Sequence, residues 1–202
     1  MRGWLRTRTA WWALLALGGL PLAWLLHGAL NDGLGANPAE ALIRATGDWT
    51  LRGLCLTLAI TPLRVQLGWP ELLRFRRLLG LLTFGYALLH LLAYAWLDMG
   101  LVPEDIVRDI PKRPFVLVGT LALLLLLPLA ATSWNGAIRR LGAARWQALH
   151  RWVYAVAVLA VLHFAWMRSG KRLYGEVWVY GLLLAALLAW RVQRRWRAAR
   201  GA

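Results

Sequence analysis

Three histidines lie in apolar segments long enough to cross a membrane, and imidazole is both a metal ligand and a proton carrier. His90 lies within one such segment, whereas His150 and His163 lie at the start of another and within it. A polar side chain at bilayer depth is costly, so its presence there indicates a functional site. For paired imidazoles on facing helices, haem iron is the ligand that we expect first.

The composition indicates an integral membrane protein. Of the 202 residues, 60% are hydrophobic and only 16% are charged, and several apolar runs approach the bilayer thickness. The net charge of +15 comes from arginines at the ends of these runs, where they are typical of topology signals, and we expect no nucleic-acid binding. The lone Cys55 excludes an internal disulfide and a cysteine-based zinc or iron–sulfur site, and we expect it to pack as a small apolar residue.

The fold predicted from these runs is an all-α bundle of six transmembrane helices in one domain, 1–202. The first basic and apolar stretch resembles a signal peptide, but its length favours a retained first helix. Breaks rich in proline, glycine and charge separate the spans, and no internal repeat is visible in the sequence. The predicted spans, in contact with membrane lipid, are 10–29, 49–65, 78–97, 115–132, 149–167 and 177–190.

The arginines also predict the orientation, because positive charge accumulates in cytoplasmic loops. The N-terminal tail, the loop around Arg76 and Arg77, the loop before His150 and the C-terminal tail are arginine-rich, which predicts cytoplasmic termini. The exception is the set Arg168, Lys171 and Arg172 on the opposite side. These cations suit the neutralisation of haem propionates or the steering of an acidic partner, or they form a solvated loop.

The predicted orientation lets the depth of each histidine be compared. His90 lies 12 residues beyond Leu78, or about 18 Å, and His163 lies 14 residues beyond Leu149, or about 21 Å. Two neutral imidazoles at one height can bind haem iron from both sides, giving the six-coordinate state suited to electron transfer. His150 lies roughly 20 Å lower, where it would serve a second, inner redox centre.

Other interpretations of these residues stay open. An intramembrane histidine can be a hydrogen-bonded packing residue, and His150 can be a non-ligating interfacial side chain. His27 has no partner at its height, so we predict that it binds no metal. Arg76 and Arg77 are either topology signals or a site for a phosphate, a haem propionate or a quinone oxygen. A different class of protein, a small proton-coupled transporter or channel, would use the same histidines as a proton relay.

The sequence resembles one family, the haem-binding membrane subunits of the bacterial periplasmic methionine-sulfoxide reductase system (the MsrQ or YedZ family), within the ferric-reductase-like transmembrane group. The resemblance runs from the first span to the sixth. It is carried by the stretches RRLLGL (76–81), KRPF (112–115), TS (132–133) and LGAARWQALHR (141–151), together with His90 and His163.

The resemblance implies a cofactor and a set of partners. Electrons would pass from membrane quinol through b-type haem to a periplasmic, molybdenum-containing methionine-sulfoxide reductase subunit, in the bacterial inner membrane. FMN is also associated with the family, with a cytoplasmic flavin reductase as a possible donor. His90, His150 and His163 match the family's haem histidines. Wider ferric-reductase-like proteins carry a second histidine on the third span, where this chain has Arg76 or Arg77.

The sequence also indicates which chemistry the chain leaves to its cofactor. It contains no nucleotide-binding glycine fingerprint and no zinc-ligand spacing. It has no cytoplasmic segment large enough to bind NADPH. We therefore interpret it as an electron-transfer subunit of an oxidoreductase system, whose polypeptide supplies ligands, burial and nearby charge.

Overall fold

A computed structural model describes residues 2–169 and 174–200, and no strand occurs among them. The long helices are α1 (Arg8–Leu30), α2 (Pro38–Leu67), α3 (Phe75–Ala93), α5 (Pro114–Ala131), α8 (Val153–Ser169) and α9 (Tyr174–Arg200). The short elements are η1 (Arg2–Arg6), η2 (Pro70–Arg74), the π-helical η3 (Tyr94–Asp98), α4 (Pro103–Lys112), α6 (Asn135–Leu141) and α7 (Ala143–His150).

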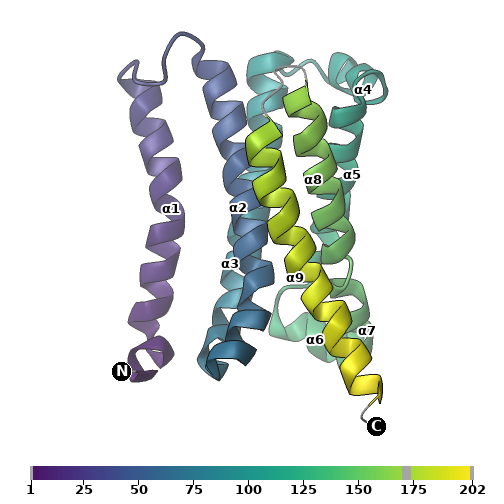
Figure 1. The fold of residues 1–202 in the computed structure, drawn as a ribbon. Helices are drawn as coiled ribbons and strands as arrows, with labels where there is room; N and C mark the ends of the chain where they lie inside the picture. The colour runs from purple at the N-terminus through teal and green to yellow at the C-terminus, as the bar shows by residue number, and fades with distance from the viewer. Residues whose placement is uncertain (1, 170–173, 201–202) are drawn as a thin grey trace.

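The long helices form one bundle in which successive members run in opposite directions (Figure 1). α2, α3, α5, α8 and α9 pack together, and α1 lies along one side of them. α1 begins and α9 ends at the same end of the bundle, which we call the terminal end. α6 and α7 also lie at the terminal end, whereas α4 lies at the opposite end.

Among the residues that the structure describes, five helical segments are long and apolar enough to cross a membrane: Arg8–Leu30, Pro70–Asp98, Pro114–Ala131, Ala143–Ser169 and Tyr174–Arg200. α2 is the longest helix at 30 residues, but it carries Arg44, Asp48, Arg52 and Arg64 and is not among these five. Its bounds and those of α9 extend well beyond the predicted spans 49–65 and 177–190. The predicted span 149–167 also differs, because a turn at Arg151 and Trp152 separates α7 from α8.

Local sequence signals explain where several helices begin and end. The Asn37 side chain accepts a hydrogen bond from the Glu40 N–H at 3.1 Å, and Pro38 occupies the first helical position of α2. α2 ends at Gly68, whose φ of +66° is the left-handed conformation that glycine adopts without steric cost. Pro114 opens α5 in the same way as Pro38 opens α2.

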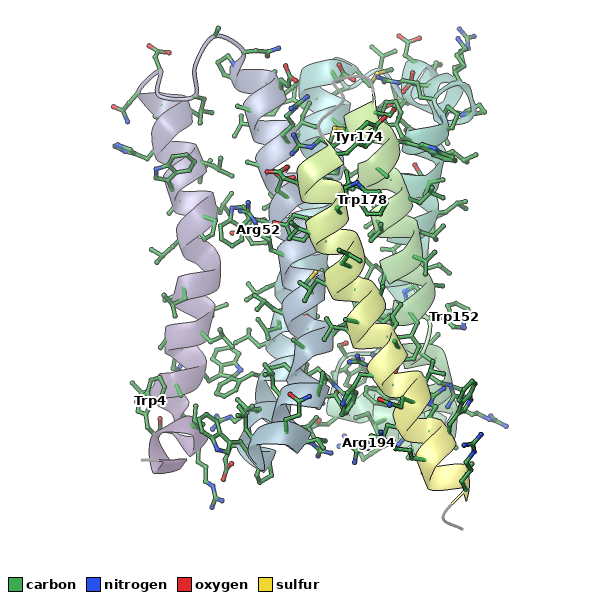
Figure 2. All side chains as sticks on the ribbon, viewed as in Figure 1. Trp4, Arg52, Trp152, Tyr174, Trp178 and Arg194 are labelled. Carbon is green, nitrogen blue, oxygen red and sulfur yellow. The ribbon has the colours of Figure 1, made fainter. Side chains whose placement is uncertain are left out.

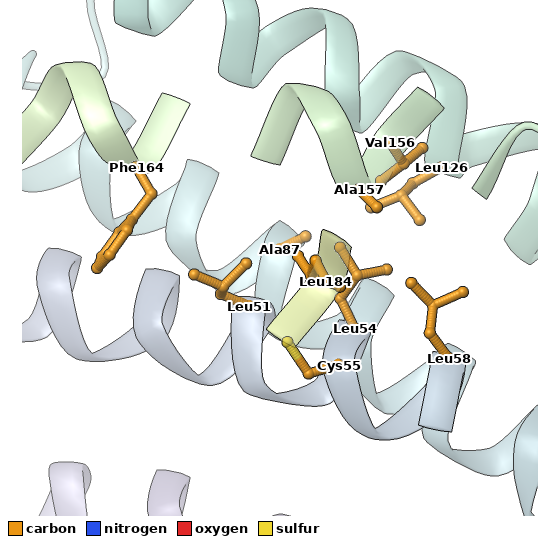
Figure 3. Packing of buried hydrophobic residues seen from close by; sticks show 10 residues of the cluster. All are labelled: Leu51, Leu54, Cys55, Leu58, Ala87, Leu126, Val156, Ala157, Phe164 and Leu184. Carbon is orange, nitrogen blue, oxygen red and sulfur yellow. The ribbon is translucent and has the colours of Figure 1, made fainter. Parts of the chain in front are cut away.

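The main core joins five of the long helices along the middle of the bundle (Figure 3). The lone Cys55 is buried in this core, which confirms its predicted role as a packing residue. α2 and α3 approach closely at Gly53, where a Cβ would lie 2.6 Å from the Thr83 hydroxyl, so a small residue is required. The core residues are Leu51, Leu54, Cys55, Leu58, Ala87, Leu126, Val156, Ala157, Phe164 and Leu184.

Tyr86 of α3 attaches α1 to the bundle through two hydrogen bonds to the backbone of α1. Pro21 lies inside α1, and proline disrupts the turn that precedes it. The Tyr86 hydroxyl of α3 donates to the Gly18 carbonyl at 2.7 Å and accepts from the Leu22 N–H at 3.2 Å. Tyr86 therefore bridges the two backbone groups of this turn and fixes α1 against α3.

Aromatic residues lie at both ends of the bundle, as in membrane-interface belts (Figure 2). Trp4 lies toward the terminal end and Trp178 toward the opposite end, and both are exposed. Arg52 of α2 lies between the two ends, where its Nε donates to the Tyr180 hydroxyl at 3.0 Å and its guanidinium covers the Trp49 ring. The charge of Arg52 is thereby directed toward aromatic and hydroxyl partners within the protein.

Candidate functional site

The rings of His90 and His163 lie next to each other. His90 comes from the last turn of α3 and His163 from α8, and their ring centroids are 5.9 Å apart with the planes at 79°. Both residues are partly buried. The two imidazoles that were predicted to reach similar heights are thus brought together, although a turn interrupts the helix on which the depth of His163 was counted.

Each ring is anchored to the backbone through the same nitrogen. His90 Nδ1 lies 2.8 Å from the Ile43 carbonyl oxygen, and His163 Nδ1 lies 2.6 Å from that of Phe115. A carbonyl only accepts, so Nδ1 must donate a proton in both rings. A neutral imidazole then keeps its lone pair on Nε2, the atom left to bind a metal. This N–H to carbonyl bond is the usual support of a ligating histidine.

A glycine lies against each ring. A Cβ on Gly47 of α2 would lie 3.0 Å from the His90 ring, and one on Gly119 of α5 would lie 2.8 Å from the His163 ring. Gly47 follows Ile43 by four residues, and Gly119 follows Phe115 by four. Each imidazole therefore rests on one helical turn that supplies both a carbonyl and the space left by a missing side chain. We call these two turns, 43–47 and 115–119, the histidine seats.

The spacing of the pair fits haem iron. A metal–imidazole bond is about 2 Å long and a ring centroid lies about 1 Å beyond the nitrogen, so two axial imidazoles place their centroids about 6 Å apart. The observed separation is 5.9 Å. Within the described part of the chain, no group of three or more His, Cys, Asp or Glu could hold a metal ion. A bare zinc ion needs three or four protein ligands, whereas haem supplies its own four nitrogens and needs only axial ones.

His150 lies in a different environment at the end of α7. Its Nε2 is 3.0 Å from the Thr132 hydroxyl, and its ring stacks on Trp146 with the centroids 4.0 Å apart. The Thr132 hydroxyl already donates to the Pro128 carbonyl at 2.6 Å, so it accepts from Nε2 of His150. This tautomer keeps the lone pair on Nδ1, the opposite arrangement from the seated pair.

Arg76, Arg77 and His150 line one cavity of about 750 Å³ at the terminal end, which we call the inner cavity. Its deeper wall is apolar, with Leu54, Phe84 and Leu126 among the residues that line it. None of the described residues that line it is acidic. Arg77 donates a hydrogen bond to the neutral Asn135 side chain at 2.8 Å. Its arginines come from three helices, α2, α3 and α9, and the turn after α7: Arg64, Arg76, Arg77, Arg151, Arg191, Arg194 and Arg195.

Arg168, one of the three cations predicted on the opposite side, is buried. Its side chain is 9% exposed and contacts Asp48 of α2 at 3.5 Å and Glu176 of α9 at 2.8 Å. Its Nε is buried without a hydrogen-bond partner, and its guanidinium covers the Phe164 ring. Arg168 therefore does not form an exposed surface for a partner. Lys171 and Arg172 lie outside the described residues.

His27 is exposed near the end of α1, and its Nδ1 lies 3.2 Å from the Asn31 side chain.

The sequence did not reveal the roles of Gly47 and Gly119 beside the histidine rings. Gly119 is a single glycine within an apolar run, whereas Gly47 lies between Thr46 and Asp48, just before the predicted span 49–65. Nothing in the sequence around either glycine marks a contact with a ring from another helix. The available signal was the similar spacing of each carbonyl residue from its histidine: His90 follows Ile43 by 47 positions, and His163 follows Phe115 by 48.

Comparison with known proteins identifies the family. Residues 46–161 match the family model described as "Ferric reductase like transmembrane component". The chain belongs to the MsrQ family, within this ferric-reductase-like group. Together with the five apolar helical segments, this membership makes the protein a multi-pass membrane protein. No solved structure matches the chain.

Three similar proteins share the description "Protein-methionine-sulfoxide reductase heme-binding subunit MsrQ". The protein from Polaromonas naphthalenivorans is 60% identical over 181 residues, 90% of this chain and 83% of that relative. The one from Azospira oryzae is 54% identical over 185 residues, 92% and 79% of the two chains. The one from Caulobacter vibrioides is 45% identical over 172 residues, 85% and 81%.

Proposed function

We propose that this protein is a membrane electron-transfer subunit that binds b-type haem between His90 and His163. It would pass electrons to the catalytic subunit of a periplasmic, molybdenum-containing methionine-sulfoxide reductase and so support the repair of oxidised periplasmic proteins. The observation that carries the proposal is the seated histidine pair, in which both Nδ1 atoms are anchored to carbonyls and the ring centroids are 5.9 Å apart, which leaves the Nε2 lone pairs to bind a metal. The names of the relatives support the same cofactor and the same system.

The proposed topology has six transmembrane helices in a single domain, both termini in the cytoplasm, and the bacterial inner membrane as location. α2 would be the sixth span. Its charges are compatible with this placement because Arg52 bonds Tyr180 and Asp48 bonds Arg168, both within the protein. The concentration of arginines at the terminal end supports a cytoplasmic position for that end.

We place electron input at the inner cavity. Arg76 and Arg77 offer fixed cationic donors for a quinol oxygen or for the phosphate of FMN, and His150 lies on the same wall. The apolar deeper wall suits the body of either molecule. A membrane quinol, or a cytoplasmic flavin reductase acting through FMN, would be the donor.

Bound haem supplies the one-electron chemistry, and the polypeptide sets where and how the iron is held. The carbonyls of Ile43 and Phe115 keep the Nδ1 protons of the two ligands in place. The apolar core around Phe164 and Ala87 excludes water from the middle of the bundle. Anchored rings in a packed core would limit the structural change between redox states.

The decisive experiment is the absorption spectrum of the purified full-length protein, with haem quantified as the pyridine haemochrome. We expect a Soret band that shifts on reduction by dithionite, and loss of one haem in His90→Ala and in His163→Ala with normal membrane insertion. His27→Ala is the matched control and should keep full haem content. A protein without haem bands, or full haem content in both pair variants, would refute the proposal and favour the proton-coupled transporter, for which proton flux in liposomes is the direct assay.

A further inference from the structure

Beyond the histidines themselves, we infer that the two seats, Gly47 with the Ile43 carbonyl and Gly119 with the Phe115 carbonyl, are matched positioning elements for haem binding. This inference rests on the proposed function. Gly47 and Gly119 would not touch the iron. They would act through His90 and His163, by fixing the direction in which each Nε2 points and the strength with which it donates to the metal.

The first support is steric. At Gly47, a Cβ would lie 3.0 Å from Cε1 and 3.1 Å from Nδ1 of His90. At Gly119, a Cβ would lie 2.8 Å from Nδ1 and 2.9 Å from Cε1 of His163. The atoms in conflict are the ring atoms beside the anchoring hydrogen bond. A methyl group would therefore push each ring away from the carbonyl that holds it, and a rigid imidazole can move only as a whole.

The second support is that the same arrangement occurs twice. In the hairpin of α2 and α3, the seat lies near the start of the first helix and the histidine near the end of the second. α5 and α8, which α6 and α7 connect, pack together with a seat at the start of α5 and His163 in the second half of α8. The separations of 47 and 48 residues between carbonyl and histidine are nearly equal. A packing accident at one helix crossing would not be expected to recur with the same ring nitrogen, the same carbonyl offset and nearly the same spacing.

The repeat gives the seats a chemical consequence. Donation from Nδ1–H to a carbonyl makes the imidazole more basic at Nε2 and stabilises ferric iron relative to ferrous iron. With a seat under each ring, both His90 and His163 would be stronger donors to the iron. Loss of either seat should weaken haem binding and raise the midpoint potential, whereas loss of a glycine elsewhere should do neither.

The test is to replace each seat glycine by alanine and to measure haem retention, midpoint potential and the low-temperature EPR spectrum of the ferric protein. Gly47→Ala and Gly119→Ala should each retain haem about 10- to 100-fold less tightly. The haem that remains should have a more positive potential and altered g-values. Gly85→Ala on α3 is the matched control, because a Cβ there meets nothing within 4 Å. Gly181→Ala on α9 is the second control, because its nearest contact is an ordinary 3.9 Å.

A double-variant comparison separates positioning from general packing damage. Alanine at position 90 removes the ring that a Cβ on residue 47 would meet. Adding Gly47→Ala to His90→Ala should therefore cause no further loss of thermal stability. Adding Gly47→Ala to His163→Ala should cause a full additional loss, since that variant leaves the His90 ring in place.

Two outcomes would overturn the inference. One is wild-type haem retention, potential and EPR spectrum in both glycine variants. The other is an equal further loss from Gly47→Ala in the His90→Ala and His163→Ala backgrounds. If His90→Ala and His163→Ala lose haem while the glycine variants do not, the inference fails and the proposed function stands. If the histidine variants keep haem, the proposed function itself fails.

Discussion

The seated histidine pair and the inner cavity both present imidazole, but they hold it in opposite ways. His90 and His163 are locked through Nδ1 to backbone carbonyls and keep Nε2 free. His150 donates through Nε2 to a hydroxyl, stacks on Trp146 and faces a cavity lined by arginines. The first arrangement suits permanent ligation of iron, because the chain fixes both the protonation state and the ring direction. The second suits a molecule that enters and leaves, because the cavity is already open.

The largest expected effect is a difference in haem content between His90→Ala and His150→Ala, which tests whether the two histidine sites are separate. His150→Ala should keep the haem component that His90→Ala loses, because the seated pair makes no use of His150. Difference spectra of the dithionite-reduced variants, scaled to protein content, measure this. Loss of the same component in His150→Ala and His90→Ala would show that the two sites are not separate.

The second prediction concerns the arginines of the inner cavity. The double change Arg76→Gln and Arg77→Gln should slow reduction by quinol or by reduced flavin about tenfold or more and leave haem content unchanged, since these arginines would bind the donor. Stopped-flow absorbance measures both quantities.

The adjacent pair Arg139 and Arg140 of α6 provides the matched control. Both lie near the same end of the bundle but do not line the inner cavity. The double change Arg139→Gln and Arg140→Gln should reduce donor turnover little. If both double variants behave alike, the arginines at positions 76 and 77 act only through orientation in the membrane.

The third prediction concerns the buried cation near the seats. Arg168→Gln should lower the free energy of unfolding by on the order of 2 kcal/mol, because Asp48 and Glu176 would lose their shared partner. Thermal unfolding monitored by circular dichroism measures this. The rate of partner reduction should keep its wild-type salt dependence, because Arg168 is buried and the exposed charges remain.

Arg108→Gln on α4 is the control, since Arg108 is exposed at the same end of the bundle. It should leave stability unchanged. A change in salt dependence for Arg168→Gln, with stability unaffected, would instead indicate that this residue steers the partner.

The smallest expected effect is on thermal stability and concerns Asp109 of α4, at the end of the bundle away from the two termini. Although burial opposes it, hydrogen bonds from Arg113 and Tyr94 lower the pKa of Asp109 below its usual value. A carboxyl group whose folded pKa is lowered stabilises the protein above its unfolded pKa, and this contribution is lost as the pH falls through the folded pKa. Asp109→Asn should therefore unfold at a lower temperature than wild type at neutral pH, and the difference should shrink in acid.

The matched control is Asp105→Asn, an exposed carboxyl on the same helix. Its melting temperature should follow wild type across the pH series. An acid-independent difference between Asp109→Asn and wild type would assign the effect to lost packing of the side chain and not to its charge.

The sequence predicted much of this protein for identifiable reasons. Apolar run length and arginine placement predicted an all-α membrane bundle, and the described residues are helical without strands. Residue counting predicted that His90 and His163 reach similar heights, because helical rise is nearly constant. It did not predict the break before α8, because Arg151 and Trp152 carry no proline or glycine to mark it. The predicted span 49–65 is also shorter than α2, which begins at Pro38, because charged residues such as Asp48 interrupt the apolar pattern of its first part.

What the sequence determined by itself is the inventory: the membrane class, the family motifs, the three histidines and the arginines beside them. What only the tertiary structure decided is which atoms those residues present to one another. The seat under His90 lies on α2 and the seat under His163 lies on α5, more than 40 positions away in the chain. Their glycines are required because two helices cross closely at those points, and a crossing depends on the packing of the whole bundle. Spacing along one helix contains no information about it.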